Sequence, residues 1–311
     1  MKHSEYLLLC ATGGLALASC SSEQVRPNVI YIVADDLGYG DLSSYNPESK
    51  IFTPALDRLA EEGIRFTDAH SSASVLSPTR YGLMTGRYPW RSRMKMGVLW
   101  TWAKPLIQDE YTMAQMFRDN GYTTGLVGKW HLGIEFPTSD GKRADNTNNG
   151  ANVDYLATIP DGPVNHGFDY YYGDDVPNFP PYVFIENDRF TSVPDMEFPK
   201  TGHPGVPGAL SSKWKAEELL SVEREKAIEY INTHKNESFY LMVCLTAPHT
   251  PIAPSDNFID KSDASRYGDF VQEMDWNIGQ ILKALDDAGI GDDTIVIFSS
   301  DNGSSFQDGN K

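Results

Sequence analysis

The chain has 311 residues, of which 40% are hydrophobic and 12% aromatic, so it can bury a large core and is not expected to be disordered. Its length allows one large domain or two smaller ones. The formal net charge of −17 argues against a nucleic-acid partner, because phosphate binding needs Lys and Arg, although cations focused in one pocket can still bind a small anion.

The first 20 residues predict a targeting segment. Lys2 and His3 precede a weakly apolar run at residues 6–18, which is too short to span a bilayer permanently. The run ends in Leu-Ala-Ser-Cys at Cys20, which resembles a bacterial lipoprotein signal whose cysteine is lipidated. We therefore expect a signal at 1–20, a tether at 21–26, and an exported lipoprotein in the periplasm or on the outer-membrane surface, held to a membrane only through Cys20. An ordinary cleaved signal with a chance cysteine is the alternative.

Three cysteines occur in the chain, and they predict no disulfide framework. Cys10 would leave with the signal, and Cys20 would be acylated. Cys244 lies inside an apolar run, which predicts a buried thiol with a packing role.

Strand-like and helix-like stretches alternate in the rest of the chain. Residues 29–34 are an apolar run rich in β-branched residues, typical of a strand buried on both faces. Thr53 and Pro54 predict the cap and first turn of a helix that Gly63 ends. Further helices are expected at residues 111–119, 215–234 and 266–288, and further strands at 123–127, 239–245 and 294–299. This alternation predicts an α/β fold with a mostly parallel sheet and helices on both faces.

The pattern weakens between residues 135 and 212, which are rich in Pro, Gly, Asn and Asp. The stretch is too long for a simple connection, so we interpret it as loops that wall an active-site cleft. Its aromatic clusters at residues 170–172 and 180–182 suggest stacking on a sugar. An insertion on the far side of the domain is the alternative.

Oxygen ligands follow two of the predicted strands. Asp35 and Asp36 come after the first strand, and Asp301 and Asn302 come after the last. Ligands of open α/β sheets bind beyond the carboxyl ends of strands, and three carboxylates with an amide suit a hard divalent cation, Ca²⁺. Each pair alone more often caps a helix or forms a turn. Their joint occurrence at two strand ends favours a metal site.

Four cationic or titratable residues follow the other strands or begin a helix. Lys129 and His131 follow the strand at 123–127, His249 follows the strand at 239–245, and Arg80 opens a short helix. A helix N-terminus itself favours anions. A single His or Lys after a strand is usually solvated or capping, so the prediction of a pocket for a tetrahedral anion depends on the whole group.

Six strings in this chain resemble the signatures of the type I, formylglycine-dependent sulfatases, and the bacterial arylsulfatase A-like and N-acetylgalactosamine-6-sulfatase-like members most of all. They are Asp-Asp-Leu-Gly-Tyr-Gly-Asp-Leu at 35–42, Ser-Pro-Thr-Arg at 77–80 with Leu-Met-Thr-Gly-Arg at 83–87, Gly-Lys-Trp-His-Leu-Gly at 128–133, Ala-Pro-His at 247–249, and Ser-Asp-Asn-Gly at 300–303. The resemblance implies an alkaline-phosphatase-like sandwich, with residues 27–311 as the N-terminal catalytic domain. It also implies a sulfuric ester hydrolase that removes sulfate from a sulfated glycan or aryl sulfate.

The resemblance further implies a role for each site residue. The Ca²⁺ ligands would be Asp35, Asp36, Asp301 and Asn302. Arg80 would orient the nucleophile, and Lys129 and His249 would hold the sulfate oxygens. His131 would transfer a proton beside the nucleophile. In the family, a Cys or Ser in the pattern Cys/Ser-x-Pro-x-Arg is oxidised to formylglycine, whose hydrate attacks sulfur and then releases sulfate as the aldehyde reforms.

Two features depart from the family pattern. With Pro78 and Arg80 in register, the nucleophile position is Leu76, which cannot become formylglycine or ligate Ca²⁺. Ser77 is out of register for that conversion, although a hydroxyl near a metal can attack directly. The family also continues past Asp-Asn-Gly with a second sulfate-binding Lys, a Glu-Gly-Gly-x-Arg segment and a smaller domain. Since Lys311 comes soon after Asn302, we expect this C-terminal part of the fold to be missing.

Three functions therefore compete. The first is an exported sulfatase, with activity in doubt because of Leu76. The second is a catalytically inactive pseudoenzyme that binds a sulfated glycan. The third is a phosphatase or phosphodiesterase of the same superfamily, which is disfavoured because those relatives use two metals with His ligands and no Asp-x-x-x-His cluster lies near either acidic strand end.

Overall fold

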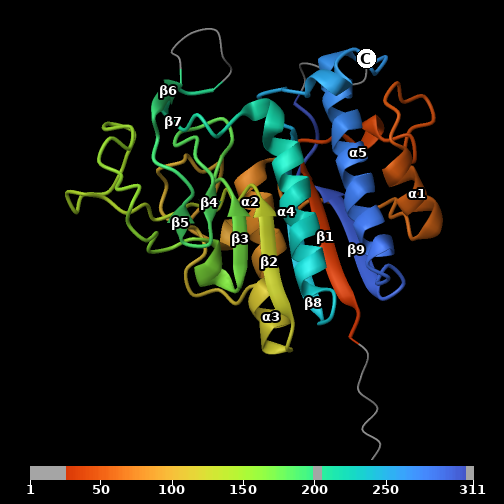
Figure 1. Cartoon of the computed structure of the whole chain (residues 1–311), viewed down its shortest axis with the longest axis horizontal. Coiled ribbons are helices and arrows are strands. Elements are labelled where there is room, and N and C mark those ends of the chain that lie inside the picture. Colours follow the sequence, from red (N-terminus) through yellow and green to blue (C-terminus); the bar gives the residue numbers. More distant parts are fainter. Residues whose placement is uncertain (1–25, 199–204, 306–311) are drawn as a thin grey trace, which may run out of the picture.

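The computed structural model describes residues 26–198 and 205–305, so the predicted signal, Cys20 and Lys311 lie outside the described residues. A seven-stranded sheet in the order β5-β4-β3-β2-β8-β1-β9 forms its centre (Figure 1). Five neighbouring strands are parallel, namely β3 (Tyr170–Gly173), β2 (Thr123–Gly128), β8 (Phe239–Pro248), β1 (Asn28–Asp35) and β9 (Thr294–Ser300). The short strands β4 (Ile185–Glu186) and β5 (Arg189–Phe190) add antiparallel pairs at one edge.

Two hydrophobic cores lie on opposite faces of the sheet, because successive side chains of a buried strand point to opposite faces. Along β1, Val29 and Val33 belong to one core, whereas Ile30 and Ile32 belong to the other. The first core includes residues of α2 (Leu76–Thr85) and α3 (Met113–Asp119). The second includes residues of α1 (Pro54–Glu62), α4 (Leu219–His234) and α5 (Ser265–Asp287), and Figure 1 shows α4 and α5 in front of the sheet. The predicted α/β fold with helices on both faces is confirmed.

The start of α1 is capped differently from the prediction. Thr53 holds the N-cap position, but its side chain makes no capping hydrogen bond. Instead, the carboxylate of Asp275 on α5 accepts from the backbone N–H groups of Ala55 (3.0 Å) and Leu56 (2.8 Å). Burial raises the pKa of Asp275 to about 6. A long-range carboxylate thus replaces the local hydroxyl cap.

Helix α5 begins one residue earlier than predicted, and α2 begins at Leu76, so Arg80 lies inside that helix and not at its start. Two other helices begin slightly later than predicted. In α3, Thr112 and Gln115 form a capping box, so the helix starts at Met113. The predicted helix from residue 215 opens with the 3-10 turn Ala216–Glu218 before α4 starts.

The stretch 135–212 is not only loops. It supplies β3, β4 and β5 to the central sheet, and it forms a separate hairpin of β6 (Met196–Phe198) and β7 (Gly208–Leu210). The prediction of sugar-stacking aromatic residues is wrong for Tyr171 and Tyr182, which are buried, whereas Tyr170 and Tyr172 are partly buried. Tyr171 belongs to the first core, and Tyr182 belongs to a third, smaller hydrophobic core with Phe184, Trp214 and Leu219.

The thiol of Cys244 is free and buried in the first core, as predicted. Burial raises its pKa to about 11, so it acts as a packing residue. Among the described residues, we find no helix with the length and apolar character needed to cross a membrane.

Candidate active site

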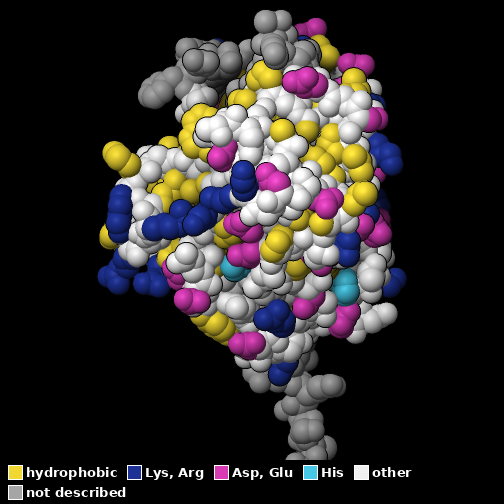
Figure 2. All heavy atoms as spheres, turned by 90° about the vertical axis from the view of Figure 1, so that its left-hand side faces the viewer, with side chains coloured by type: hydrophobic (Ala, Val, Ile, Leu, Met, Phe, Trp, Pro, Cys, Tyr) yellow, Lys and Arg dark blue, Asp and Glu magenta, His cyan; other side chains and the backbone are white. Residues whose placement is uncertain are grey.

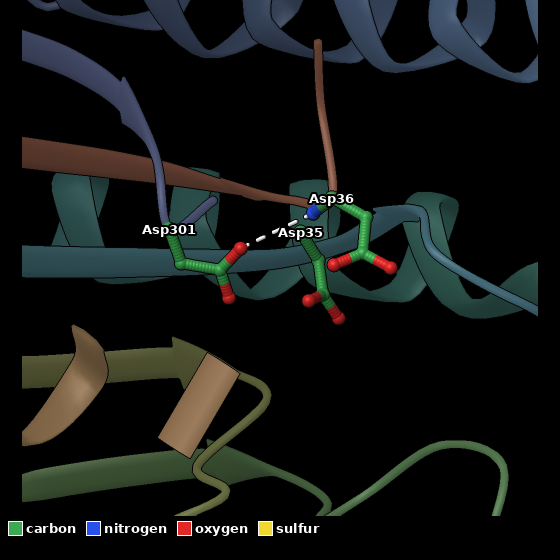
Figure 3. A group of neighbouring side chains, drawn as sticks. All are labelled: Asp35, Asp36 and Asp301. Atoms are coloured by element: carbon green, nitrogen blue, oxygen red, sulfur yellow. Dashed lines mark hydrogen bonds between the residues drawn. The ribbon is translucent and has the colours of Figure 1, made fainter. Parts of the chain in front are cut away.

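Three carboxylates converge where β1 and β9 end. The two strands pair in parallel as far as Ala34 and Ser300, so the residues that follow them emerge side by side. Oxygen atoms of Asp35, Asp36 and Asp301 all lie within 4.8 Å of one another (Figure 3). The backbone turns at Asp36, where φ is 66°, and the Asp36 N–H donates to Asp301 Oδ1 at 3.1 Å.

The chemistry of this acidic cluster fits a divalent cation. Burial, together with the charge of Asp35, raises the pKa of Asp301 to about 7 and also raises the pKa of Asp36. The buried oxygens Asp35 Oδ1 and Asn302 Oδ1 have no hydrogen-bond partner among the described residues. Asn302 also belongs to the cluster, since its Nδ2 donates to Asp36 Oδ1 at 2.5 Å. Repelling carboxylates and unpaired oxygens are what a bound hard cation would stabilise.

Two buried cations, Arg80 and Lys129, contact the acidic cluster. Arg80 on α2 donates from Nε to Asp301 Oδ2 at 3.0 Å, and its Nη2 atom lies 2.9 Å from the same oxygen. Lys129 Nζ lies 2.5 Å from Asp35 Oδ2. Burial opposes the ionisation of Asp35, but Lys129, His249 and Arg80 more than offset it and lower the pKa of Asp35 below its ordinary value. The two cations therefore keep this carboxylate charged.

The position of Lys129 depends on the glycine before it. Gly128 ends β2 with φ of 101°, and a Cβ at this position would collide with the carbonyl of Cys244. Only glycine fits such a close approach at positive φ. This turn carries Lys129 from the end of β2 to the acidic cluster.

His249 and Asp36 border the accessible side of the site. His249 follows β8, and its Nε2 lies 3.7 Å from Asp36 Oδ2. Both side chains are 14% exposed, whereas Asp35, Arg80 and Lys129 are at most 2% exposed. A ligand would therefore approach past His249 and Asp36.

The imidazole of His131 is held in one tautomer. Its Nε2 lies 2.9 Å from the carbonyl oxygen of Leu99, which can only accept, so Nε2 carries the hydrogen. Its Nδ1 is buried with a free lone pair and has no partner within the described part of the chain. Burial and the charge of Lys129 lower the pKa of His131 well below its ordinary value. His131 is thus a neutral imidazole whose Nδ1 can accept a proton or a hydrogen bond.

Leu76 is the first residue of α2 and precedes Arg80 by four residues, so both side chains lie on one face of the helix. Arg80 on that face contacts Asp301. Leu76 is only 9% exposed, yet it belongs to none of the three hydrophobic cores that the described residues form. Residue 76, the nucleophile position that the family resemblance implies, is thus a leucine one helical turn before Arg80.

Ser77 does not replace Leu76 as a nucleophile. Its side chain is 0% exposed, and its hydroxyl oxygen accepts the backbone N–H of Leu99 at 3.1 Å. The hydroxyl oxygen is therefore engaged in a bond that links α2 to residue 99. Leu99 thus bridges the start of α2 and His131 through its own N–H and C=O groups.

A second acidic group was missed by sequence reasoning. Asp174 and Asp175 come directly after β3, much as Asp35 and Asp36 lie at the end of β1, but the aromatic residues of β3 obscured the strand. The carbonyl and the Oδ1 atom of Asp175 accept the His131 N–H at 3.0 and 3.1 Å, which helps to hold His131 at φ of 54°. Burial raises the pKa of Asp174 to about 6, and burial with the charge of Asp174 raises that of Asp175 to about 7.

The Asp175→Asn variant is expected to be more stable than the unchanged chain, by a difference in free energy of unfolding that grows as the pH rises. The ordinary pKa of 3.8 rises to about 7 in the folded state, so the fold binds this proton more tightly than the unfolded chain does. The free energy of unfolding should therefore fall for the unchanged chain, relative to Asp175→Asn, between about pH 4 and pH 7. The asparagine oxygen can still accept the His131 N–H. Urea unfolding in excess Ca²⁺ measures the difference, with exposed Asp68→Asn as control; a difference that stays constant with pH would contradict this assignment.

Comparison with known proteins identifies similar sequences along nearly the whole chain. A model of the family described as Sulfatase matches residues 27–311. The N-acetylgalactosamine-6-O-sulfatase of Bacteroides thetaiotaomicron is 35% identical over 99% of this chain and 66% of its own length. Human arylsulfatase H is 30% identical over 91% of this chain and 58% of its own length. The chain thus spans about three fifths of the length of the relatives that it matches.

Solved structures with a similar fold include a Bacteroides thetaiotaomicron protein described in work on the metabolism of multiple glycosaminoglycans. It aligns with a TM-score of 0.78 and 33% identity, covering 90% of this chain and 63% of that one. A second protein, solved in complex with k-i-k-neocarrahexaose, aligns with a TM-score of 0.66 and 25% identity, covering 92% of this chain and 60% of that one.

Proposed function

The chain belongs to the sulfatase family, and from this premise we propose that it binds the sulfate ester of a sulfated glycan at the acidic cluster. We further propose that it is a sulfuric ester hydrolase by descent and that its Leu76 form binds the ester without hydrolysing it. The observation that carries the proposal is the cluster of three carboxylates, Asp35, Asp36 and Asp301, two of which pair with buried cations: Asp301 with Arg80, and Asp35 with Lys129.

The charge balance of the site favours a monoanion. Arg80 and Lys129 offset two of the three carboxylate charges, and a divalent cation on Asp35, Asp36, Asp301 and Asn302 would leave one net positive charge. A sulfate ester carries one negative charge, whereas a phosphate monoester carries about −1.5 to −2 at pH 7. The balance therefore supports a sulfate ester over a phosphate monoester.

Each residue has a proposed task in binding and orienting the ester. Ca²⁺, when bound, would polarise a sulfate oxygen as a Lewis acid. Lys129 and His249 would hold the other sulfate oxygens, since they lie on the buried and the accessible sides of the acidic cluster. Arg80 would position a nucleophile at residue 76 and His131 Nδ1 would accept its proton, but leucine at 76 leaves both tasks unused.

The family's formylglycine does not fit this chain. The Leu76 side chain is entirely hydrocarbon, so it offers no heteroatom to oxidise, hydrate or direct at sulfur. Ser77 is engaged with the Leu99 N–H and offers no substitute. We therefore propose no covalent step for the Leu76 form.

The proposal of a glycan rests on the relatives. One acts, by its name, on N-acetylgalactosamine 6-sulfate groups, and another was solved with an oligosaccharide. We propose an oligosaccharide sulfate ester as the partner and, from the sequence, an exported lipoprotein anchored through Cys20. The two-metal phosphatase alternative finds less support, because the one metal-suited cluster found among residues 26–198 and 205–305 contains no histidine.

Calorimetry with N-acetylgalactosamine 6-sulfate in excess Ca²⁺ tests the proposed function. We expect binding of this sugar, no binding of unsulfated N-acetylgalactosamine, and an affinity about tenfold weaker in His249→Ala, because one hydrogen bond to a charged group is lost. His70→Ala is the matched control, since His70 is an exposed histidine that pairs only with Asp68. Equal binding of the two sugars, or an equal effect of the two histidine variants, would rule out this site.

A further inference from the structure

Positive charge gathers in one segment of this acidic chain. Between residues 86 and 107 there are no acidic residues, whereas the whole chain has 43 acidic and 26 basic residues. Eight exposed residues of this segment, which we call the basic strip, combine cations with aromatic rings. They are Arg87, Tyr88, Trp90, Arg91, Arg93, Lys95, Trp100 and Lys104.

The basic strip is a compact surface rather than a loose loop. The rings of Tyr88 and Trp90 stack with centroids 4.1 Å apart, and Lys95 Nζ donates to the Trp90 carbonyl at 2.6 Å. Arg93 donates to the carbonyls of Lys104 and Pro105. These contacts tie the two halves of the strip together. Figure 2 shows Lys and Arg side chains gathered at one side of the face, beside apolar side chains.

Four of the five cations of the basic strip lack an acidic partner among the described residues. Within the described residues, no carboxylate forms an ion pair with Arg91, Arg93, Lys95 or Lys104, and Arg87 meets Glu110 only at 3.9 Å. Burial and the charge of Arg143 lower the pKa of Arg93, so the strip also repels a cation from a neighbouring loop. Although the chain is rich in acidic residues, they do not offset this repulsion between cations. The strip is therefore suited to bind an external polyanion.

The basic strip is continuous with the candidate active site. Leu99 lies inside the segment, and its backbone bonds both His131 and Ser77. The next residue, Trp100, is 55% exposed and contacts Phe179 edge-on, with ring centroids 5.0 Å apart. The exposed ring of Trp100 is therefore carried by the residue next to the one whose backbone holds His131, and this adjacency in the chain links the strip to the site.

We propose that the basic strip is a second anion-binding surface that holds the flanking sulfate or carboxylate groups of a polyanionic oligosaccharide. Exposed Tyr88, Trp90 and Trp100 offer flat faces for sugar rings, and the unpaired cations between them bind the acidic substituents. The inference deepens the proposed function: the ligand is an oligomer with several anionic groups, rather than a single sulfated sugar. An extended nucleic acid suits the surface less well, because the net charge of −17 repels it beyond the strip.

The test compares two probes and two charge-matched double variants in excess Ca²⁺. The probes are N-acetylgalactosamine 6-sulfate and a chondroitin 6-sulfate hexasaccharide, measured by calorimetry at two salt concentrations. Arg91→Ala/Lys95→Ala removes two cations of the strip. Arg118→Ala/Lys235→Ala removes two exposed cations at the ends of α3 and α4. These residues lie just before β2 and β8 begin, at the amino ends of the strands, whereas the acidic cluster lies at the carboxyl ends.

We expect the strip variant to bind the hexasaccharide about fivefold more weakly and with a smaller salt dependence, while its affinity for the monosaccharide stays unchanged. The control variant should bind both probes like the unchanged chain. Unchanged monosaccharide binding also shows that the strip variant is folded. A Trp90→Ala variant should weaken only hexasaccharide binding.

Several results would overturn the inference. If the strip variant bound the hexasaccharide as tightly as the unchanged chain does, the inference of a second anion-binding surface would be overturned. The proposed function would still stand, provided that the unchanged chain binds the monosaccharide. An equal loss in the control variant would mean that net charge, and not the strip, attracts the probe. If a single-stranded DNA oligonucleotide bound more tightly than the hexasaccharide, the ligand of the strip would be a nucleic acid and not an oligosaccharide. Failure of the unchanged chain to bind either sugar would overturn both proposals.

Discussion

Replacing Leu76 with cysteine is expected to create sulfatase activity that the Leu76 form lacks, with a gain of roughly 1,000-fold or more. Cysteine at 76 completes the Cys-x-Pro-x-Arg pattern with Pro78 and Arg80, and the position lies on the helix face that meets Asp301. The variant is made in this chain fused to the C-terminal region of the Bacteroides relative, and it is coexpressed with the enzyme that forms the aldehyde. Release of 4-nitrophenol from its sulfate ester measures the rate.

The controls separate chemistry from packing. Leu76→Ala removes the hydrocarbon without adding a heteroatom and should stay inactive, as should the unchanged chain in the same fusion. Sulfate release by the Leu76 fusion would disprove our view that residue 76 abolishes turnover. A cysteine variant that carries the aldehyde by mass spectrometry, binds Ca²⁺ and still does not turn over would favour a binding protein over a disabled hydrolase.

Asp36→Asn is expected to weaken Ca²⁺ binding between about tenfold and 100-fold, because one anionic ligand and its charge are lost. Asp36 suits this test better than Asp35, whose loss would also leave buried Lys129 unpaired. In the unchanged chain, Ca²⁺ at about 100 times its dissociation constant should stabilise the fold by about 2.7 kcal/mol. Calorimetry and thermal unfolding measure both effects.

Exposed Asp68→Asn serves as the control and should leave Ca²⁺ affinity unchanged. Because Leu76 adds no oxygen ligand, we also expect this chain to bind Ca²⁺ more weakly than the Bacteroides relative does. Absence of any Ca²⁺ binding by the folded chain would refute the assignment of Asp35, Asp36, Asp301 and Asn302.

The sequence predicted the fold and the acidic cluster because both depend on local patterns. Apolar runs marked β1, β8 and β9, and polar residues directly after a parallel strand must meet at one edge of the sheet. Asp35, Asp36 and Asp301 could therefore be placed together before any contact was known.

Other features depend on residues that are distant in the sequence. Asp275 caps α1 from more than 200 residues away, so Thr53 looked like the natural cap. The tyrosines of β3 resembled a sugar platform because their burial depends on neighbouring strands. For the same reason, Asp175 was not connected with His131, which it contacts across the site.

The bridge made by Leu99 has an evolutionary consequence. Its hydrogen bonds to Ser77 and His131 use only main-chain atoms of residue 99, so they tolerate drift in its side chain. None of the contacts of Arg80, Lys129 or His131 described above involves the side chain at 76 either. A lineage that loses its nucleophile can therefore keep the surrounding scaffold intact.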